Sequence, residues 1–480
     1  MRARRESYDV VIIGAGIGGL VCGNFLARKG LSVLICEQHT RPGGYVCGFR
    51  RKGFYFDGGV QSFSSSGLFF PILAKLGLLG ETRFSRAYFR LTAPDVDVVV
   101  RSLEDVESSF LEAYPGAKEG LEKFFSLLGD LVEAMGNVVR EPNPWVEEGL
   151  GRVTAALSLI PKIGSLRKFR LHRGERAADL MRRYIGDERP RRLLSSLGYP
   201  NSSVVAYAGM WYSWLHDYWY PMGGMQSLAD LLARSFEERG GTIAYRTLVR
   251  RILIEEGRAC GVRLSNGTEV RSSFVVGACD YKRLFEELVG PEHLDPSWLR
   301  RVREAAVSES MFTVYLGVDY GPQDLLDLLE THHVFYWSTY DIPRPSDASD
   351  PNYFERVGLL ISCPSLTDPS LAPEGKSVLI IQAMAPYDWM DRWGTGGSGV
   401  RTERYRRLKE RVASLLVKRA EELIPDLSSR VEVMDAATPI THERYTLNSE
   451  GATSGWTWDP HRCFIRSGCL DVLPSHTALR

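Results

Sequence analysis

Apolar runs that end at glycine or acidic residues divide the start of the chain into strand, turn and helix. Residues 8–13 read Tyr-Asp-Val-Val-Ile-Ile, a β-branched run typical of a parallel strand buried on both faces. A glycine-rich break over 14–19 follows this run, and the small-residue segment 20–29 predicts a helix. A second apolar run over 32–36 ends at Glu37. The pattern therefore predicts a compact βαβ unit.

The pattern beyond this unit predicts a long helical stretch and then a return to strands. Residues 105–195 are helical and charged in pattern, and alternation resumes after residue 224. The later predicted elements are a helix over 227–239, strands over 242–245, 249–254 and 261–264, a turn at Asn266-Gly267, a buried strand over 274–278, strands over 311–318 and 377–382, and a helix over 401–422. We therefore predict an α/β fold with a helical insert and a second, mixed sheet.

The glycine-rich break has the spacing of a dinucleotide-binding turn. Gly14, Gly16 and Gly19 form a GxGxxG pattern directly after a buried strand and at the start of a helix. The first glycine permits the tight bend, the second lets the backbone approach a pyrophosphate, and the third lets the helix pack on the sheet. The helix N-terminus stabilises the phosphate charge. The candidate binding residues of this turn are Gly14, Ala15, Gly16, Ile17, Gly18 and Gly19.

Glu37 completes the dinucleotide-binding pattern. It lies 18 residues beyond Gly19 at the end of the second strand, where its carboxylate can accept hydrogen bonds from ribose hydroxyls. A glycine-rich turn without a ligand is the structural alternative. A second GxGxxG pattern over 394–399 follows Asp388-Trp-Met-Asp-Arg-Trp, which is not a buried strand. We therefore interpret this second pattern as a flexible loop.

Composition limits the classes of partner. The chain has 480 residues, 46 of them glycine, with 59 Lys and Arg against 59 Asp and Glu, so its formal net charge is zero. This balance argues against nucleic acid as a partner, and the length allows about two to four domains. Eight cysteines without CxxC pairs favour a reducing, cytoplasmic setting. No apolar stretch is long enough to span a bilayer, so any membrane contact would be peripheral.

Further glycine-rich segments extend the pattern beyond the first turn. They are Arg41-Pro-Gly43-Gly44, Gly53-Phe-Tyr-Phe-Asp57-Gly58-Gly59, Tyr220-Pro-Met-Gly223-Gly224 and a segment from Thr441 to Gly455. With these segments the sequence resembles the FAD-dependent phytoene desaturase, carotenoid isomerase and retinol saturase family, which shares a flavoprotein fold with the amine oxidases. The resemblance runs from about residue 8 to about residue 460, with gaps in the helical insert.

The resemblance implies a Rossmann-type FAD-binding domain, a discontinuous mixed-sheet substrate domain and a helical insert. The expected ranges are 1–100 for the first part of the FAD-binding domain, 101–220 for a membrane-leaning helical insert with part of the substrate domain, 221–290 for the second part of the FAD-binding domain, 291–440 for the mixed sheet of the substrate domain, and 441–480 for an incomplete return to the FAD-binding domain.

FAD is the cofactor that the resemblance implies, and it adds binding residues. In the family the first turn holds the ADP part of FAD, and a turn matching Gly43-Gly44 runs beside the phosphates and the ribityl chain. Arg41 is a candidate cation for the pyrophosphate, with a solvated surface arginine as the alternative. Val249 matches the position whose backbone meets the adenine, and it reads equally well as a strand core residue.

The C-terminus departs from the family pattern. Family members follow the segment 441–455 with a strand, a glycine-rich turn and a helix that approach the isoalloxazine ring. Here the sequence runs from Asp459-Pro through Cys463 to Arg480 without that turn. A natural variant, a truncation or a frameshift would each explain this departure. We therefore expect the chain as written to bind FAD weakly or not at all. Stoichiometric, tightly bound FAD would contradict this hypothesis.

Two clusters bear on the substrate. The first is an aromatic cluster, which would either line a channel for a long apolar molecule or pack as an ordinary core. It comprises Tyr207, Trp211, Tyr212, Trp214, Tyr218, Trp219 and Tyr220.

The second is a basic cluster, which would either rest on an anionic membrane surface or form a solvated face. It comprises Lys162, Arg167, Lys168, Arg170, Arg173 and Arg176. They interleave with Leu159, Ile160, Ile163, Leu166, Phe169 and Leu171.

The leading functional prediction is an FAD-dependent oxidoreductase. It would desaturate, saturate or isomerise a carotenoid or another long isoprenoid by hydride transfer to or from flavin N5. A flavin amine oxidase and a non-catalytic prenyl- or lipid-binding protein are the alternatives. No acid or base is required for such chemistry, and we assign no catalytic residue.

Several polar residues remain without an assigned role. Asp57, His216, His442 and Glu443 could lie near a flavin, but hydrogen-bonded structural roles are the safer expectation for all four. His332 and His333 are sequence neighbours, which would face opposite sides of a strand, so we expect no metal site there.

Overall fold

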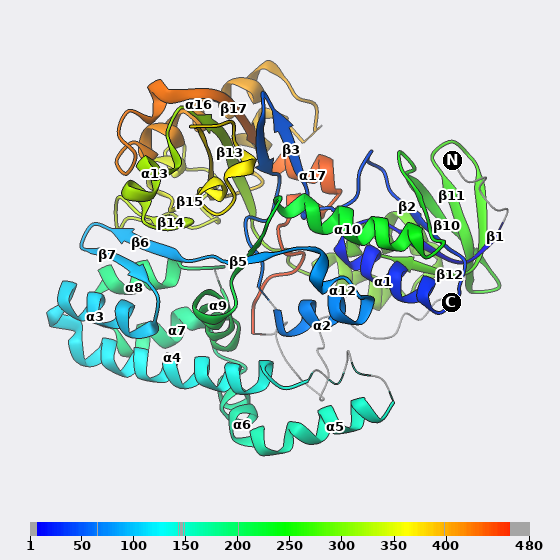
Figure 1. Ribbon diagram of the computed structural model, residues 1–480, viewed down its shortest axis with the longest axis horizontal. Coiled ribbons are helices and arrows are strands. Elements are labelled where there is room, and N and C mark those ends of the chain that lie inside the picture. Colours follow the sequence, from blue (N-terminus) through cyan, green and yellow to red (C-terminus); the bar gives the residue numbers. More distant parts are fainter. Residues whose placement is uncertain are drawn as a thin grey trace.

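Two sheets organise the chain, and helices cover them (Figure 1). The computed structural model describes residues 7–460 apart from 65, 143, 145, 146, 148, 200 and 398. The first sheet has six strands in the order β10-β11-β12-β1-β2-β9. These strands are β1 (Ser7–Ile13), β2 (Val33–Cys36), β9 (Thr242–Ala244), β10 (Val249–Glu255), β11 (Arg258–Leu264) and β12 (Glu269–Gly277). The run β12-β1-β2-β9 is parallel, as a Rossmann-type domain requires.

Alternate residues of β1 pack into two separate cores, which explains its unbroken apolar sequence. Val10 and Ile12 face helices α1 (Ile17–Arg28) and α10 (Met225–Glu238) on one side of the sheet. Val11 and Ile13 face the other side, which is covered by the π-helical segment Leu284–Val289 and by α12 (Pro296–Glu304). The predicted strand buried on both faces is therefore confirmed.

Most predicted boundaries in this domain lie within a few residues of the observed ones. Helix α1 starts at Ile17, three residues before the predicted start, because Gly18 and Gly19 adopt the helical conformation. The predicted strand over 274–278 is the end of β12, but its predicted burial is wrong. Phe274 is 68% exposed, although Val270 and Ser272 earlier in the strand are buried.

The second sheet has seven strands in the order β17-β13-β16-β15-β14-β6-β7. They are β6 (Phe89–Ala93), β7 (Val96–Val100), β13 (Ser310–Val318), β14 (His333–Tyr336), β15 (Leu359–Ser362), β16 (Ser377–Ala385) and β17 (Val431–Ala437). The pair β14 and β6 is parallel and the other pairs are antiparallel, which makes this a mixed sheet as predicted. Strands β6 and β7 lie within 1–100, the range expected for the FAD-binding domain, yet they belong to this sheet.

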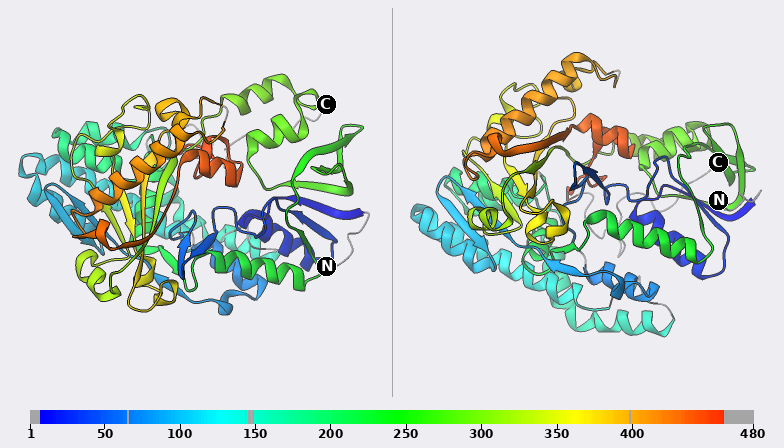
Figure 2. Two further views of the ribbon diagram at one scale, coloured as in Figure 1. Left: turned by 90° about the horizontal axis from the view of Figure 1, so that it is seen from above. Right: turned by 45° about the horizontal axis from the view of Figure 1, so that its top comes forward.

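Further helices pack around the second sheet. They are α13 (Pro322–Leu329), α14 (Tyr353–Arg356), α15 (Trp389–Gly394), α16 (Glu403–Ala420) and α17 (Pro439–Thr446). Because α15, not a strand, precedes the second GxGxxG pattern, that pattern lacks the context of a dinucleotide-binding turn. Helix α17 follows β17 and lies between the two sheets (Figure 2).

A helical layer occupies the middle of the chain, where the sequence predicts it. Its helices are α3 (Leu103–Ala113), α4 (Lys118–Val139), α5 (Leu150–Ser158), α6 (Ile163–His172), α7 (Ala177–Tyr184), α8 (Glu188–Ser196) and α9 (Val204–His216). Helices α5 and α6 form the lower edge of the molecule (Figure 1). Within the described residues, no helix combines the length and the apolar character needed to cross a bilayer.

Small elements join these parts. A hairpin of β3 (Gly48–Arg51) and β4 (Phe54–Asp57) packs against the second sheet, and β5 (Phe84–Arg86) pairs with β8 (Trp219–Pro221). The remaining α-helices of the described residues are α2 (Ser66–Leu76) and α11 (Tyr281–Arg283), and several 3-10 helices of three or four residues lie in the connections.

Candidate functional site

The turn between β1 and α1 is closed by its glycines. Gly14 has φ +103° and donates its N–H to the carbonyl of Cys36 at 2.9 Å, which ties the turn to the end of β2. A Cβ on Gly19 would lie 2.1 Å from the Gly14 carbonyl oxygen, so only glycine lets α1 approach the turn. Gly16, the residue before the helix, has open space where a Cβ would stand.

Glu37 is buried at the end of β2, with its carboxylate held by backbone donors. Oε2 accepts the N–H of Ala15 at 2.8 Å, and Oε1 accepts the N–H of His39 at 2.9 Å. Each carboxylate oxygen has a second lone pair, so both oxygens can accept a further hydrogen bond. The turn and the carboxylate are therefore fixed relative to one another before any ligand binds.

A cavity of about 390 Å³ opens at this turn. Of the predicted cofactor-binding residues, Gly14, Gly16, Ile17, Glu37, Gly43, Gly44 and Val249 line it. The N–H groups at the start of α1, the open space at Gly16 and the Glu37 carboxylate suit a diphosphate next to a ribose. The residues present therefore fit the adenosine diphosphate half of FAD, and their assignment as binding residues stays a prediction.

Four predicted residues lie outside the lining of this cavity. Ala15 supports Glu37 through its N–H, Gly18 is exposed on α1, and Gly19 packs on the turn. The exposed Arg41 donates from Nη1 to the Gly48 carbonyl at 2.7 Å, which fits its alternative interpretation as a surface arginine.

The cavity also has walls that the sequence reasoning did not assign. His39 and Arg283 line it, and Arg283 brings a guanidinium that forms an ion pair with Glu287 at 3.0 Å. A further wall is formed by Tyr445, Thr446, Leu447 and Asn448, about 400 residues along the chain from the turn. The one sequence signal for this wall is the family resemblance of the segment 441–455.

Asp57 has the structural role that was the safer expectation. Its carboxylate accepts the hydroxyl of Tyr220 at 2.6 Å, the hydroxyl of Tyr55 at 3.0 Å and the N–H of Met225 at 2.8 Å. Burial raises the pKa of Asp57 to about 6. The carboxylate thus joins β4 to the first turn of α10, and its hydrogen-bond partners account for it without a flavin.

The two adjacent histidines contradict the expectation that they face opposite sides of a strand. Their ring centroids are 4.2 Å apart, because His332 precedes β14 and strand alternation does not apply to it. Hydroxyls contact three of the four ring nitrogens: Thr367 contacts His332 Nδ1 (2.6 Å), and Ser62 and Ser362 contact the two nitrogens of His333 (2.8 Å each), whereas His332 Nε2 is buried without a hydrogen-bond partner. Among the described residues no cluster of three metal-ligating side chains occurs.

The other polar candidates are spread over the molecule. His442 is buried beside Tyr45, and burial lowers its pKa to about 4. Glu443 accepts the hydroxyl of Tyr387 at 2.7 Å, whereas His216 is exposed at the end of α9.

The aromatic cluster before Gly223 packs mainly as a core. Tyr207, Trp211 and Tyr212 of α9 belong to the hydrophobic core of the helical layer, and Trp211 contacts Trp214 at 5.6 Å between ring centroids. Tyr220 is fully buried and donates its hydroxyl to Asp57. For these residues the core interpretation describes the structure better than a channel.

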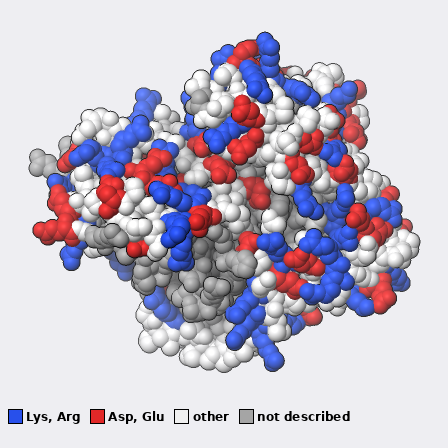
Figure 3. Space-filling model, turned by 180° about the vertical axis from the view of Figure 1, so that it is seen from behind, with Lys and Arg blue, Asp and Glu red and all other residues white. Residues whose placement is uncertain are grey.

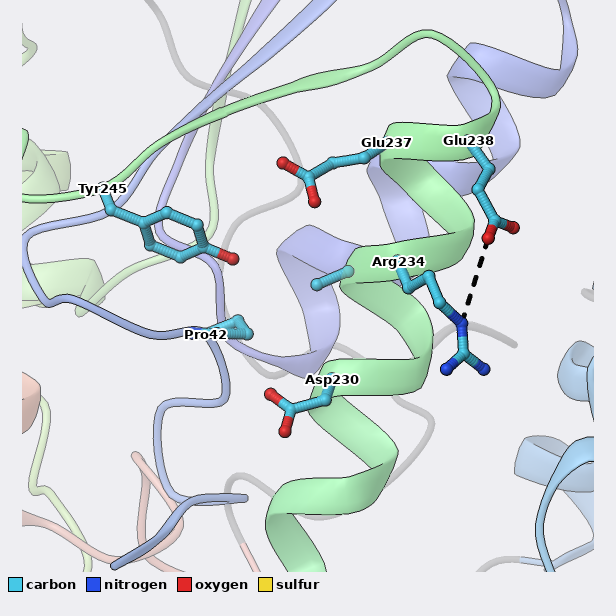
Figure 4. A pocket seen from close by; sticks show the side chains of 7 residues that line it. Pro42, Asp230, Arg234, Glu237, Glu238 and Tyr245 are labelled. Atoms are coloured by element: carbon cyan, nitrogen blue, oxygen red, sulfur yellow. Dashed lines mark ion pairs between the residues drawn. The ribbon is translucent and has the colours of Figure 1, made fainter. Parts of the chain in front are cut away.

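A second cavity, of about 470 Å³, lies along α10 (Figure 4). It is lined by Pro42, Asp230, Ala233, Arg234, Glu237, Glu238 and Tyr245. Arg234 forms ion pairs with Glu81 and Glu238. Three carboxylates in this wall would repel a diphosphate, so the electrostatics favour the cavity at Glu37 as the cofactor site. The expected loss of the C-terminal glycine turn concerns 461–480, outside the described residues.

Comparisons with known proteins match the whole architecture. A family model described as flavin containing amine oxidoreductase matches residues 17–461. A solved oxidoreductase from Methanosarcina mazei has a TM-score of 0.58 at 17% identity, and the match covers 93% of this chain and 90% of that chain. This second likeness shows the fold alone.

Three curated relatives align over nearly the full chain. Prolycopene isomerase of Daucus carota is 28% identical, over 93% of this chain and 72% of the relative. All-trans-retinol 13,14-reductase of Danio rerio is 25% identical, over 94% and 78%. Zeta-carotene-forming phytoene desaturase of Myxococcus xanthus is 27% identical, over 90% and 81%.

Proposed function

This chain belongs to the family of flavin-containing amine oxidoreductases and its cofactor is FAD, and from this premise we propose that it acts on a carotenoid or another long isoprenoid. When bound, FAD supplies hydride acceptance or donation at N5, chemistry that suits desaturation, saturation or isomerisation of a polyene. One observation carries the proposal: relatives named for prolycopene, retinol and phytoene each match at least 90% of this chain.

The chain's own residues would bind and orient the cofactor. The N–H groups at the start of α1 would face the diphosphate. Glu37, whose carboxylate is held by the N–H groups of Ala15 and His39, would accept hydrogen bonds from the ribose hydroxyls. Arg283 adds positive charge to the same cavity. These groups need not exchange protons with a substrate, in keeping with the absence of an assigned acid or base.

The proposed substrate is tested by reacting flavin-loaded protein with candidate substrates in the absence of oxygen. Phytoene, prolycopene, all-trans-retinol and putrescine are each mixed with protein carrying oxidised or reduced flavin, and flavin absorbance and the products are followed. We expect conversion of at least one polyene and none of the amine. Flavin reduction by the amine alone would identify an amine oxidase. Bound flavin without conversion of any polyene would favour a non-catalytic lipid-binding protein.

We also propose that α5 and α6 rest on an anionic lipid surface from which an apolar substrate is taken. Large apolar side chains are exposed along these helices and the turn between them: Leu150, Val153, Leu157, Ile160, Ile163 and Leu171. Leu150 is 84% exposed and Leu171 is 72% exposed, although Phe169 between them points into the core. An apolar surface of this kind is costly in water and marks an interaction site.

The charge of the same segment supports an anionic partner. Residues 150–176 contain seven Lys and Arg and one acidic residue, Glu175, in a chain whose net charge is zero. Figure 3 shows the lower end of the molecule as a largely uncharged surface with Lys and Arg beside it. Basic side chains next to exposed apolar ones are the pattern of an interfacial helix on anionic lipid.

A further inference from the structure

The strap, residues 445–452, closes one side of the FAD cavity. Its first four residues line the cavity together with Glu37 and Val249. The strap is carried by the second-sheet domain, because it comprises the end of α17, which follows β17, and the short helical turn Ser449–Gly451. The turn at Gly14 and the carboxylate of Glu37 belong to the first sheet. Two domains therefore meet across this cavity.

One end of the strap is attached beside Glu37. Gln38 donates from Nε2 to the Tyr445 carbonyl at 3.0 Å, and His39 contacts the same oxygen through Nε2. The rings of His39 and Tyr445 are stacked, with centroids 5.5 Å apart and planes at 23°. Since Gln38 and His39 directly follow Glu37, the strap covers the end of the cavity where the ribose is expected.

The other end of the strap is attached to Asp280 and Tyr45. Ser449 donates its N–H and its hydroxyl to the Asp280 carboxylate, each at 2.9 Å. The hydroxyl of Tyr45 lies 3.1 Å from the Gly451 carbonyl and 3.0 Å from the Ala452 carbonyl. Both anchor residues belong to loops of the first domain, so these contacts also cross between the domains.

Polar contacts hold the strap against the first domain. Tyr445 is 57% exposed at one end. At the other end Gly451 and Ala452 are buried, and Ser310 of β13 donates its hydroxyl to the Gly451 carbonyl at 2.8 Å. Leu447 and Glu450 have φ of +58° and +57°, a left-handed conformation that is unfavourable for a non-glycine residue. Opening the strap therefore breaks the polar contacts to Gln38, His39, Tyr45 and Asp280, while Ser310 keeps Gly451 on the second sheet.

We propose that the strap is a positioning element for the cofactor, which closes over the adenosine end of FAD and opens for the cofactor to enter or leave. The inference rests on FAD as the cofactor, but not on the identity of the substrate. Because the cavity lies between the strap and Glu37, an adenosine diphosphate group bound there would contact both walls. Its binding then favours the closed strap, and a weaker strap releases it faster.

The test is amide hydrogen exchange of the full chain with and without ADP, which carries the half of FAD that this cavity fits. Slower exchange in 445–452 together with 14–19 would support the proposal. Protection of 14–19 and of Glu37 without any change in 445–452 would overturn it. Protection in neither segment would overturn the cofactor site as well as the strap, whereas a failure of the substrate assay leaves this readout unaffected.

Variants separate the strap from general stability. We expect the double substitution Tyr45→Phe and Ser449→Ala, which removes side-chain hydrogen bonds to the strap, to raise the FAD dissociation rate about tenfold. Flavin fluorescence after dilution measures this rate. Tyr320→Phe is the matched control, since its hydroxyl bonds the Pro425 carbonyl away from the cavity. Release from the double variant at the wild-type rate, with the fold intact by circular dichroism, would overturn the proposal.

Discussion

At the scale of single residues, the buried carboxylates of Glu37 and Asp57 have different roles. Glu37 follows β2, and Asp57 is the last residue of β4. Glu37 accepts two backbone N–H groups and faces a cavity, so its remaining lone pairs are available to a ligand. Asp57 accepts three donors and is fully enclosed, so its hydrogen-bonding capacity serves the fold. Both are acidic residues that follow short apolar runs in the sequence, and only the three-dimensional partners distinguish them.

Adjacent glycines in α1 provide a matched pair of substitutions. A Cβ on the exposed Gly18 would meet nothing within 4 Å, so Gly18→Ala should stabilise the protein by about 0.5–1 kcal/mol through helix propensity. A Cβ on Gly19 would meet the Gly14 carbonyl oxygen at 2.1 Å, so Gly19→Ala should destabilise by at least about 2 kcal/mol. Urea unfolding of both variants measures the difference, and equal effects would contradict the packing described for α1.

At the scale of elements, Asp57 links the β3–β4 hairpin to α10. We expect Asp57→Ala to destabilise the protein by about 3 kcal/mol or more, because it leaves two hydroxyls and one N–H without their acceptor. Asp97→Ala is the control, since Asp97 pairs with Arg90 at a partly exposed site and such pairs contribute less than about 1 kcal/mol. Denaturant unfolding that ranks Asp97→Ala as the more damaging change would refute this role of Asp57.

The surface of α5 and α6 predicts binding to anionic vesicles. Reversing two exposed charges with Arg167→Glu and Arg170→Glu should weaken co-sedimentation with phosphatidylglycerol-containing vesicles at least about tenfold, because each basic residue contributes about 1 kcal/mol. Arg406→Glu with Arg407→Glu on α16 is a control of equal charge at another exposed site. Equal loss from both pairs would mean that net charge, rather than this surface, governs any binding.

The local sequence pattern was sufficient to predict the elements whose pairing partners are close in the sequence. The unit β1–α1–β2 and the hairpin of β11 and β12 follow from strand patterns, glycines and the Asn266-Gly267 turn. Long-range pairing was not predictable: β6 joins the second sheet through β14, with Phe89 opposite His333, and no periodicity encodes that neighbour. The strap and Arg283 were missed for the same reason, because a cavity wall assembled from distant segments has no local signature.

At the scale of the whole molecule, buried histidines predict loss of stability in acid. Burial lowers the pKa of His332 to about 3 and of His442 to about 4, and it places the pKa of His333 well below the ordinary value. Below pH 6.5 the unfolded chain binds these protons and the folded chain does not, so stability falls as pH falls. Asp57 acts in the opposite direction, because its raised pKa lets the folded state bind a proton first below about pH 6.

The three histidines outweigh the one aspartate. Each histidine contributes about 1.4 kcal/mol per pH unit, so the net loss from these four groups is about 3 kcal/mol between pH 6 and pH 5. Denaturant unfolding at pH 7, 6 and 5 measures the slope, and His442→Gln should reduce the net slope between pH 6 and pH 5 by about half, because it removes one of the three histidine contributions. Stability that is constant or higher at pH 5 would contradict the buried, neutral state of these rings.

The central claim is that the cavity between the β1–α1 turn and Glu37 binds FAD, and equilibrium titration of the flavin-free protein with FAD tests it most directly. The expectation of weak or absent binding rests on residues 461–480, outside the described residues. The account instead predicts saturation at one FAD per chain. Glu37→Gln should reduce the affinity at least about tenfold, because an amide loses the charge that strengthens the ribose hydrogen bonds. Glu238→Gln, in the acidic cavity along α10, should bind as the wild type does. An absence of saturable binding, or equal affinity in Glu37→Gln, would contradict the account.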